Sequence, residues 1–207
     1  DGTKDYENIT AVDLNTLQQC LQELLETGRT MLPEFDFLTE HRKAQRRPLE
    51  LQDGVCIVEG IHALNPQTTS QLPADSIYRV YVGLREEYSK GGQRVLPSRD
   101  IRLARRLVRD YKYRGHSLEK TLGMWPSVCA GEDKYIKVFK PQADLLLDTS
   151  FSYEICVLAG EITPLAGKLE GRPGAERLNE LAGIFSLCRQ MPVEWVPADS
   201  MLREFLG

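Results

Sequence analysis

Residues 77–84 read IYRVYVGL, an apolar run of the length expected for a strand buried on both faces of a sheet. Two other segments have the same character: LELQDGVCIVEGI (49–61), whose VCIV run is the clearest strand of the chain, and ADLLLDT (143–149). Between the last two strands, residues 99–112 and 117–130 repeat apolar side chains at helical spacing. Strands that alternate with helices predict an α/β fold with a parallel sheet.

The remaining segments predict a helix and a turn before the first strand, and helices after the last one. Leucines at helical spacing predict a helix from Thr10 to Thr27, with Thr10 and Asp13 as a capping box and Gly28 at its end. The basic stretch HRKAQRR (41–47) is typical of an exposed loop or hairpin. After residue 150 the pattern is helical, most clearly at 175–188.

Composition restricts the function classes. The chain has 207 residues and a formal net charge of −4, which disfavours a general nucleic-acid binder. No apolar run reaches the roughly 20 residues that span a bilayer, and the first residues do not resemble a signal peptide. We therefore expect no membrane partner. The five cysteines are scattered without a CxxC pair, which predicts structural thiols in a reducing, cytoplasmic compartment.

Positive charge is concentrated in one segment of this acidic chain. RDIRLARRLVRDYKYRG (99–115) contains seven cationic side chains and two acids, Asp100 and Asp110. On a helix with 3.6 residues per turn, one face carries four arginines: Arg102, Arg105, Arg106 and Arg109. Because guanidinium groups bind phosphate through paired hydrogen bonds, the segment predicts a pocket for a small anion. A solvated face paired with surface carboxylates is the alternative.

One carboxylate has a position typical of a metal ligand. Glu59 follows the predicted strand at 55–58, where parallel sheets bind ligands, and it could hold Mg²⁺ directly or through water. A cap on the following helix is the alternative role. The phosphate-binding motif G-x-x-x-x-G-K-[ST] does not occur in the 207 residues.

Several motifs together resemble a known family. PEFDF followed by HRK (33–43), VCIVEGI (55–61) and the arginine segment (99–115) occur in this order, and the last continues into RGHS and MWPSV (114–128). The chain is similar to the phosphoribulokinase/uridine kinase family of P-loop kinases, and most similar to a bacterial uridine kinase-like branch. The ending SMLREFLG (200–207) also resembles that branch.

The resemblance implies a three-layer, P-loop kinase-like α/β fold with a parallel sheet, N-terminally incomplete and with a helical C-terminal extension. Residues 1–150 would form the C-terminal part of a nucleoside kinase-like domain, with an arginine lid at 94–130. Residues 151–207 would be the helical extension packed on it. The helices after Ala175 are expected to pack on the core, and a homo-oligomer interface is the alternative.

The resemblance also implies roles for individual residues. Arg106, Arg109 and Arg114 would contact the phosphates of ATP and the transferred γ-phosphoryl group, and Glu59 would lie near Mg²⁺. Glu7 would hold the ribose of a nucleoside. The other residues expected at the substrate are Phe35, Asp36, Glu40, His41 and His116.

The sequence differs from the family pattern at three points. Phe35 replaces a tyrosine, and Glu40 aligns with a histidine, so uridine is not specified as the substrate and another small hydroxyl compound is an alternative. The phosphate-binding loop and catalytic aspartate of the family are missing, so the chain alone is expected to be inactive. Three functions are therefore compatible with the sequence: a fragment of an ATP:nucleoside phosphotransferase, a kinase for another hydroxyl substrate, or an inactive module that binds nucleotide, RNA or protein.

Overall fold

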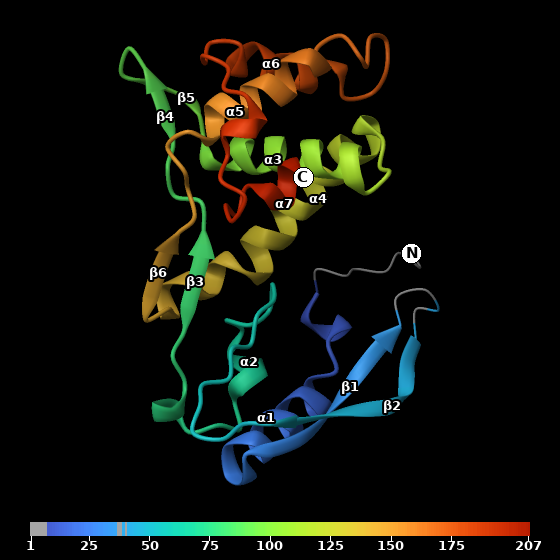
Figure 1. Cartoon of the computed structure of the whole chain (residues 1–207), viewed down its shortest axis with the longest axis vertical. Coiled ribbons are helices and arrows are strands. Elements are labelled where there is room, and N and C mark those ends of the chain that lie inside the picture. The colour runs from blue at the N-terminus through green and yellow to red at the C-terminus, as the bar shows by residue number, and fades with distance from the viewer. Residues whose placement is uncertain (1–7, 37–38, 40) are drawn as a thin grey trace. The chain divides into compact units, whose positions relative to one another are not determined.

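The computed structural model describes residues 8–36, 39 and 41–207, and it shows a mixed α/β chain (Figure 1). The chain divides into two compact units. Unit 1 contains the described part of residues 1–81 together with 130–145. Unit 2 contains residues 82–129 and 146–207. Glu7 and Glu40, both predicted to contact the substrate, lie outside the described residues.

In unit 1, helix α1 (Leu14–Thr27) packs on a hairpin of strands β1 (Arg29–Asp36) and β2 (His41–Glu50). The helix begins four residues later than expected because Asp13 is the N-cap, and its carboxylate accepts a 3.1 Å hydrogen bond from Thr16 N. It ends at Gly28, whose φ of 72° favours glycine. Of the two predicted structures for residues 41–47, the hairpin is confirmed.

The prediction of a strand at residues 55–58 is wrong. These residues form no strand, and the side chains of Val55 and Ile57 are each 87% exposed. An apolar run forms a buried strand only if neighbouring strands supply its backbone hydrogen bonds. Among the described residues, none pairs with this run. The other elements of unit 1 are short: η1 (Ile9–Ala11), α2 (Pro66–Thr69), η2 (Ala74–Ser76) and η3 (Lys137–Gln142).

The other two predicted strands are confirmed and pair with each other. They are β3 (Val80–Gly83) and β6 (Leu145–Asp148). Leu145 N donates to Arg79 O, and Thr149 N donates to Gly83 O, each at 3.1 Å. The partners move along both strands in the same direction, so the pair is parallel.

Unit 2 contains helices and a hairpin, in addition to the last residues of β3 and β6. Its helices are α3 (Ser98–Tyr113), most of α4 (Leu118–Tyr135), α5 (Glu154–Ile162), α6 (Ala175–Phe185) and α7 (Arg203–Leu206), with the short turns η4 (Thr163–Leu165) and η5 (Val193–Trp195). The hairpin pairs β4 (Tyr88–Lys90) with β5 (Gln93–Leu96). Figure 1 shows α3 and α7 beside each other, in agreement with their contacts.

Helix α3 lies at the centre of the unit 2 core. Ile101, Leu103, Ala104 and Leu107 of α3 are each 0% exposed. They pack with buried side chains of α5, α6 and α7, among them Val157, Leu178, Phe185 and Leu206. None of the helices within the described residues is long and apolar enough to cross a membrane.

A buried ion pair connects α3 to α5. Arg105 Nε donates to Glu154 Oε2 at 3.0 Å, and Arg105 Nη2 donates to both Glu154 Oε2 and, at 3.1 Å, Thr149 O. The two side chains are 7% and 0% exposed. Burial raises the pKa of the Glu154 carboxyl, and the Arg105 guanidinium opposes that rise. The pair joins α3, the end of β6 and the start of α5 through one guanidinium.

Replacing one member of this pair tests its importance. Arg105→Met leaves Glu154 buried without a counter-charge, so we expect unit 2 to lose about 3–5 kcal/mol of unfolding free energy. Urea unfolding followed by tryptophan fluorescence measures this loss, because Trp125 and Trp195 both lie in unit 2. The double variant Arg105→Met/Glu154→Leu should recover most of the loss. An unchanged midpoint for Arg105→Met would show that the pair does not stabilise the unit.

Candidate anion-binding site

Three arginines of the α3 region surround one buried carboxylate. Asp110 is 1% exposed, and its oxygens lie 3.3 Å from Arg106 Nε, 3.1 Å from Arg109 Nε and 3.8 Å from Arg114 Nη1. His116 Nδ1 is also 3.8 Å from Asp110 Oδ2. We call these four cationic or titratable residues and Asp110 the arginine cluster. The structure thus brings together Arg106, Arg109, Arg114 and His116, the unit 2 residues to which the family resemblance gave a role in the site.

The end of helix α3 creates this arrangement. Arg106 and Arg114 are one helical turn before and after Asp110, at the spacing that places side chains together. Arg114 N and His116 N donate to Asp110 O at 3.3 and 3.0 Å, so the chain folds back over its last turn. Gly115 permits this turn with a φ of 64°.

The arginine cluster has more positive than negative charge. Three guanidinium groups lie near one buried carboxylate, and a second acid, Glu204, has its Oε1 3.7 Å from Arg109 Nη1. The buried Arg106 Nε and His116 Nδ1 make no hydrogen bond within the described part of the chain. Each of the three guanidinium groups carries five N–H donors, and paired donors of this kind bind phosphate oxygens, so the donor set fits a polyphosphate such as the tail of ATP.

The other two arginines of the predicted face do not join the arginine cluster. Arg105 is bound to Glu154, as described above, and Arg102 lies over the Trp125 ring, with Cζ 6.0 Å from its centroid. The contacts therefore divide these arginines into Arg102 and Arg105, which are engaged elsewhere in unit 2, and Arg106 and Arg109, which face Asp110. The helical periodicity of the sequence placed all four arginines of α3 on one face. It could not show which of them contact Asp110 and which contact other parts of unit 2.

In unit 1, three predicted substrate residues lie at the end of the β1–β2 hairpin. Asp36 pairs with His41 and Phe35 with Arg42 in the strand register. The Phe35 side chain is 51% exposed. A neighbouring cavity of about 590 Å³ is lined by α1 and both strands, including Asp13, Glu34 and Arg42. Hydrogen bonds from Thr16, together with Arg42, lower the pKa of the Asp13 carboxyl there.

Glu59, the predicted metal ligand, is an exposed residue outside any helix or strand. The described residues contain no group of three or more histidine, cysteine or acidic side chains that could hold a metal. Mg²⁺ is often held by one carboxylate with water and substrate phosphates completing its six ligands. Glu59 offers one carboxylate for that use, but the buried strand that was predicted to place it at the edge of a parallel sheet is not formed.

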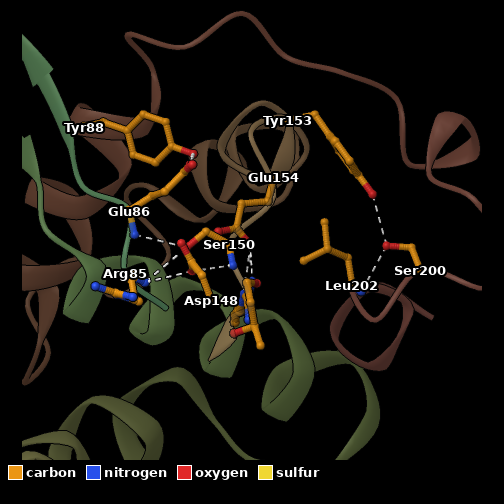
Figure 2. Close-up of polar contacts among 11 residues, drawn as sticks. Arg85, Glu86, Tyr88, Asp148, Ser150, Tyr153, Glu154, Ser200 and Leu202 are labelled. Atoms are coloured by element: carbon orange, nitrogen blue, oxygen red, sulfur yellow. Dashed lines mark hydrogen bonds and ion pairs between the residues drawn. The ribbon is translucent and has the colours of Figure 1, made fainter. Parts of the chain in front are cut away.

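A second polar network connects the loops that follow β3 and β6 (Figure 2). Ser150 donates through Oγ and N to Asp148 Oδ1 at 2.7 and 3.0 Å. Backbone N–H groups of Arg85 and Glu86 donate to Ser150 Oγ at 3.2 and 3.1 Å. The hydrogen bonds that Asp148 accepts from Ser150, together with one from Arg85 N at 3.1 Å, lower the pKa of the Asp148 carboxyl. The network fixes the segment between β6 and Glu154, and so the acid that binds Arg105.

Tyrosines lie on two sides of this network. Tyr88 donates to Glu86 Oε2 at 3.2 Å, and its pKa is raised by burial and by the nearby Glu86 charge. Tyr153 OH lies 3.1 Å from Ser200 Oγ, which also accepts from Leu202 N (Figure 2). Sequence analysis missed this network, because it joins residues up to 65 positions apart without a recognisable motif.

Comparison with known proteins identifies the family. The sequence profile of the phosphoribulokinase / uridine kinase family matches residues 2–153. The chain therefore belongs to this family, as its motifs predicted. The match ends one residue before α5 begins at Glu154.

Individual relatives are similar over most of this chain. It is 27% identical over 154 residues to a uridine kinase of Staphylococcus haemolyticus, covering 74% of the chain and 66% of the relative. A uridine kinase of Clostridium tetani is 27% identical over 80% of the chain and 73% of its own length. One from Saccharomyces cerevisiae is 27% identical over 86% of the chain and 32% of its own length. The chain thus spans just under two thirds of the staphylococcal relative.

Asp110→Asn tests whether the carboxylate holds the arginine cluster together. The change keeps the side-chain shape but leaves three guanidinium groups without their buried counter-charge. We expect unit 2 to lose about 2–4 kcal/mol of unfolding free energy, with part of the loss recovered in high salt. Urea unfolding followed by tryptophan fluorescence is the measurement. The exposed Asp199→Asn serves as control, and equal midpoints for the two variants would contradict the role of Asp110.

Proposed function

We propose that this chain is part of an ATP-dependent phosphotransferase that phosphorylates a hydroxyl group of a nucleoside or similar small molecule. The observation that carries the proposal is the arginine cluster, in which Arg106, Arg109 and Arg114 surround a single buried carboxylate. Phosphoryl transfer depends mainly on positioning and on cations that stabilise charge on the phosphoryl oxygens. Family membership and the names of the relatives support the same reaction.

In this proposal each side chain has a limited task. Arg106, Arg109 and Arg114 bind phosphate oxygens of ATP, and Asp110 keeps their guanidinium groups in place. Glu59 holds Mg²⁺, which neutralises phosphate charge when bound. Phe35, Asp36 and His41, at the hairpin end, contact the acceptor molecule, as do Glu7, Glu40 and His116.

The structure restricts the identity of the phosphate acceptor less than it restricts the kind of phosphate donor. Phe35 offers a ring without a hydroxyl group, so it can stack on a base but cannot donate a hydrogen bond to it. Asp36 and His41 are cross-strand neighbours and can bind hydroxyl groups. This chemistry suits uridine, other nucleosides and further small polyols, and we propose the nucleoside because the relatives are uridine kinases.

Nucleotide binding provides the first test. We expect Mg²⁺–ATP to bind the chain weakly, and Arg106→Ala/Arg109→Ala to weaken binding at least tenfold, because each charge-assisted hydrogen bond contributes about 1.5–3 kcal/mol. Isothermal titration at two salt concentrations measures the effect. Arg94→Ala/Arg172→Ala removes two exposed arginines of the same unit as a matched control. Equal losses in both double variants would indicate non-specific attraction.

Turnover provides the second test. The 207 residues contain no G-x-x-x-x-G-K-[ST] motif, whose backbone N–H groups and lysine hold the β- and γ-phosphates in P-loop kinases. We therefore expect no phosphorylated uridine or cytidine when the purified chain is incubated with labelled ATP and Mg²⁺. A uridine kinase such as the staphylococcal relative is the positive control. Robust turnover by this chain alone would disprove the dependence on a phosphate loop.

A further inference from the structure

Helix α7 contacts the arginine cluster from nearly a hundred residues further along the chain. The Phe205 ring lies close to two guanidinium groups, with its centroid 5.1 Å from Arg105 Cζ and 5.8 Å from Arg109 Cζ. The Glu204 carboxylate is 3.7 Å from Arg109 Nη1. Both interactions are attractive, since a cation is stabilised by an aromatic face and by an opposite charge. Arg109 is therefore engaged by α7 as well as by Asp110.

The chain around these two residues is firmly attached to unit 2. Leu202 and Leu206 are 1% and 3% exposed and belong to the same core as α3. Tyr113 OH, at the end of α3, donates to Leu206 O. Arg203 donates to the carbonyl oxygens of Val193 and Val196. Glu204 and Phe205 thus reach Arg109 from an anchored segment and not from a freely moving tail.

The three arginines of the cluster differ in how accessible they are. The side chain of Arg114 is 52% exposed, whereas those of Arg106 and Arg109 are 24% and 16% exposed. Arg109 is the most enclosed, and α7 contributes to that enclosure. A phosphate that binds Arg109 through two parallel hydrogen bonds needs the guanidinium edge that faces Glu204. Asp110 is buried and stays in place, while Glu204 is 59% exposed and can swing into water.

We propose that α7 is an autoinhibitory latch on the arginine cluster: Glu204 and Phe205 occupy Arg109 until a polyphosphate displaces Glu204. This inference rests on the proposed binding of ATP phosphates by Arg106, Arg109 and Arg114. It adds a regulatory contact made by residues beyond the family match, which ends at residue 153. The latch lowers phosphate affinity and favours ligands with enough negative charge to replace the Glu204 carboxylate.

The expected effect follows from the exposure of the ion pair. The Arg109–Glu204 pair is partly exposed and 3.7 Å apart, so it contributes little free energy. Removing it with Glu204→Gln should therefore strengthen polyphosphate binding by about two- to fivefold. Phe205→Leu keeps an apolar side chain against the core but removes the aromatic face, and its effect should have the same sign. High salt screens the pair and should reduce the gain for Glu204→Gln.

Tripolyphosphate without metal is a suitable probe, because it supplies the anionic part of ATP alone. Its dissociation constant is measured by isothermal titration for the intact chain and for Glu204→Gln, at about 50 and 300 mM salt. Glu161→Gln is the matched control: Glu161 of α5 pairs with Lys112 of α3 at 2.6 Å, so this variant also removes one negative charge that faces a cation of α3. Tryptophan fluorescence checks that each variant is folded.

The result that supports the latch is tighter binding to Glu204→Gln and Phe205→Leu than to the intact chain and to Glu161→Gln. Binding detected only in Glu204→Gln would support it more strongly. Equal gains in Glu204→Gln and Glu161→Gln would overturn it, because the effect would then be general electrostatics.

Arg106→Ala/Arg109→Ala separates the two proposals. If this variant loses binding while Glu204→Gln binds as the intact chain does, the latch is wrong and the anion site remains. If it binds tripolyphosphate as well as the intact chain does, the proposed anion site is wrong. Absence of binding in the intact chain and in all variants would overturn both.

Discussion

The buried contact between Arg105 and Glu154 positions the helix on which the candidate site depends. Two charges removed from water are costly unless their hydrogen bonds are satisfied. Here the guanidinium donates to Glu154 Oε2 and to the Thr149 carbonyl, which connects α3 to the end of β6 and the start of α5, although Glu154 Oε1 accepts no hydrogen bond from the described residues. The loops after β3 and β6 are held in turn by Asp148 and Ser150 (Figure 2). The residues that follow the family match are therefore part of the framework of α3.

Arg106, Arg109 and Arg114 are held by a shared counter-charge and not by a one-to-one ion pair. Asp110 offers one buried negative charge to several cations, so no cation is fully neutralised. This surplus lets the cluster attract an anion, while the buried carboxylate prevents the guanidinium groups from spreading apart. Glu204 reduces the surplus at Arg109 alone. In the proposed latch, competition with Glu204 would select highly charged ligands, because a weak anion gains too little to displace an existing partner.

Local patterns in the sequence predicted those features that depend on neighbouring residues. Helical spacing identified α1, α3 and α6, and the arginines of α3 carried the functional hypothesis. The hairpin turn at Gly91 and Gly92, with φ values of 60° and 80°, was a readable signal that the sequence analysis did not use. Residues 55–58 were predicted as a strand because they are apolar, but pairing depends on distant segments, and the described structure supplies none. The contacts of Arg105, Arg109 and Asp148 with distant residues were likewise beyond local reasoning.

The burial of α3 also limits how the arginine cluster can respond to a ligand. Ile101, Leu103 and Leu107 are fully buried, and exposing one such side chain costs about 1.5–3 kcal/mol. Moving the whole helix out of this core would therefore cost about as much free energy as several arginine–phosphate contacts return. After Tyr113 the chain is exposed, and Gly115 allows a change of direction. Adjustment to an anion should therefore come from Arg114, from the turn that follows it and from exchange of side-chain partners such as Glu204, while α3 itself stays in the core.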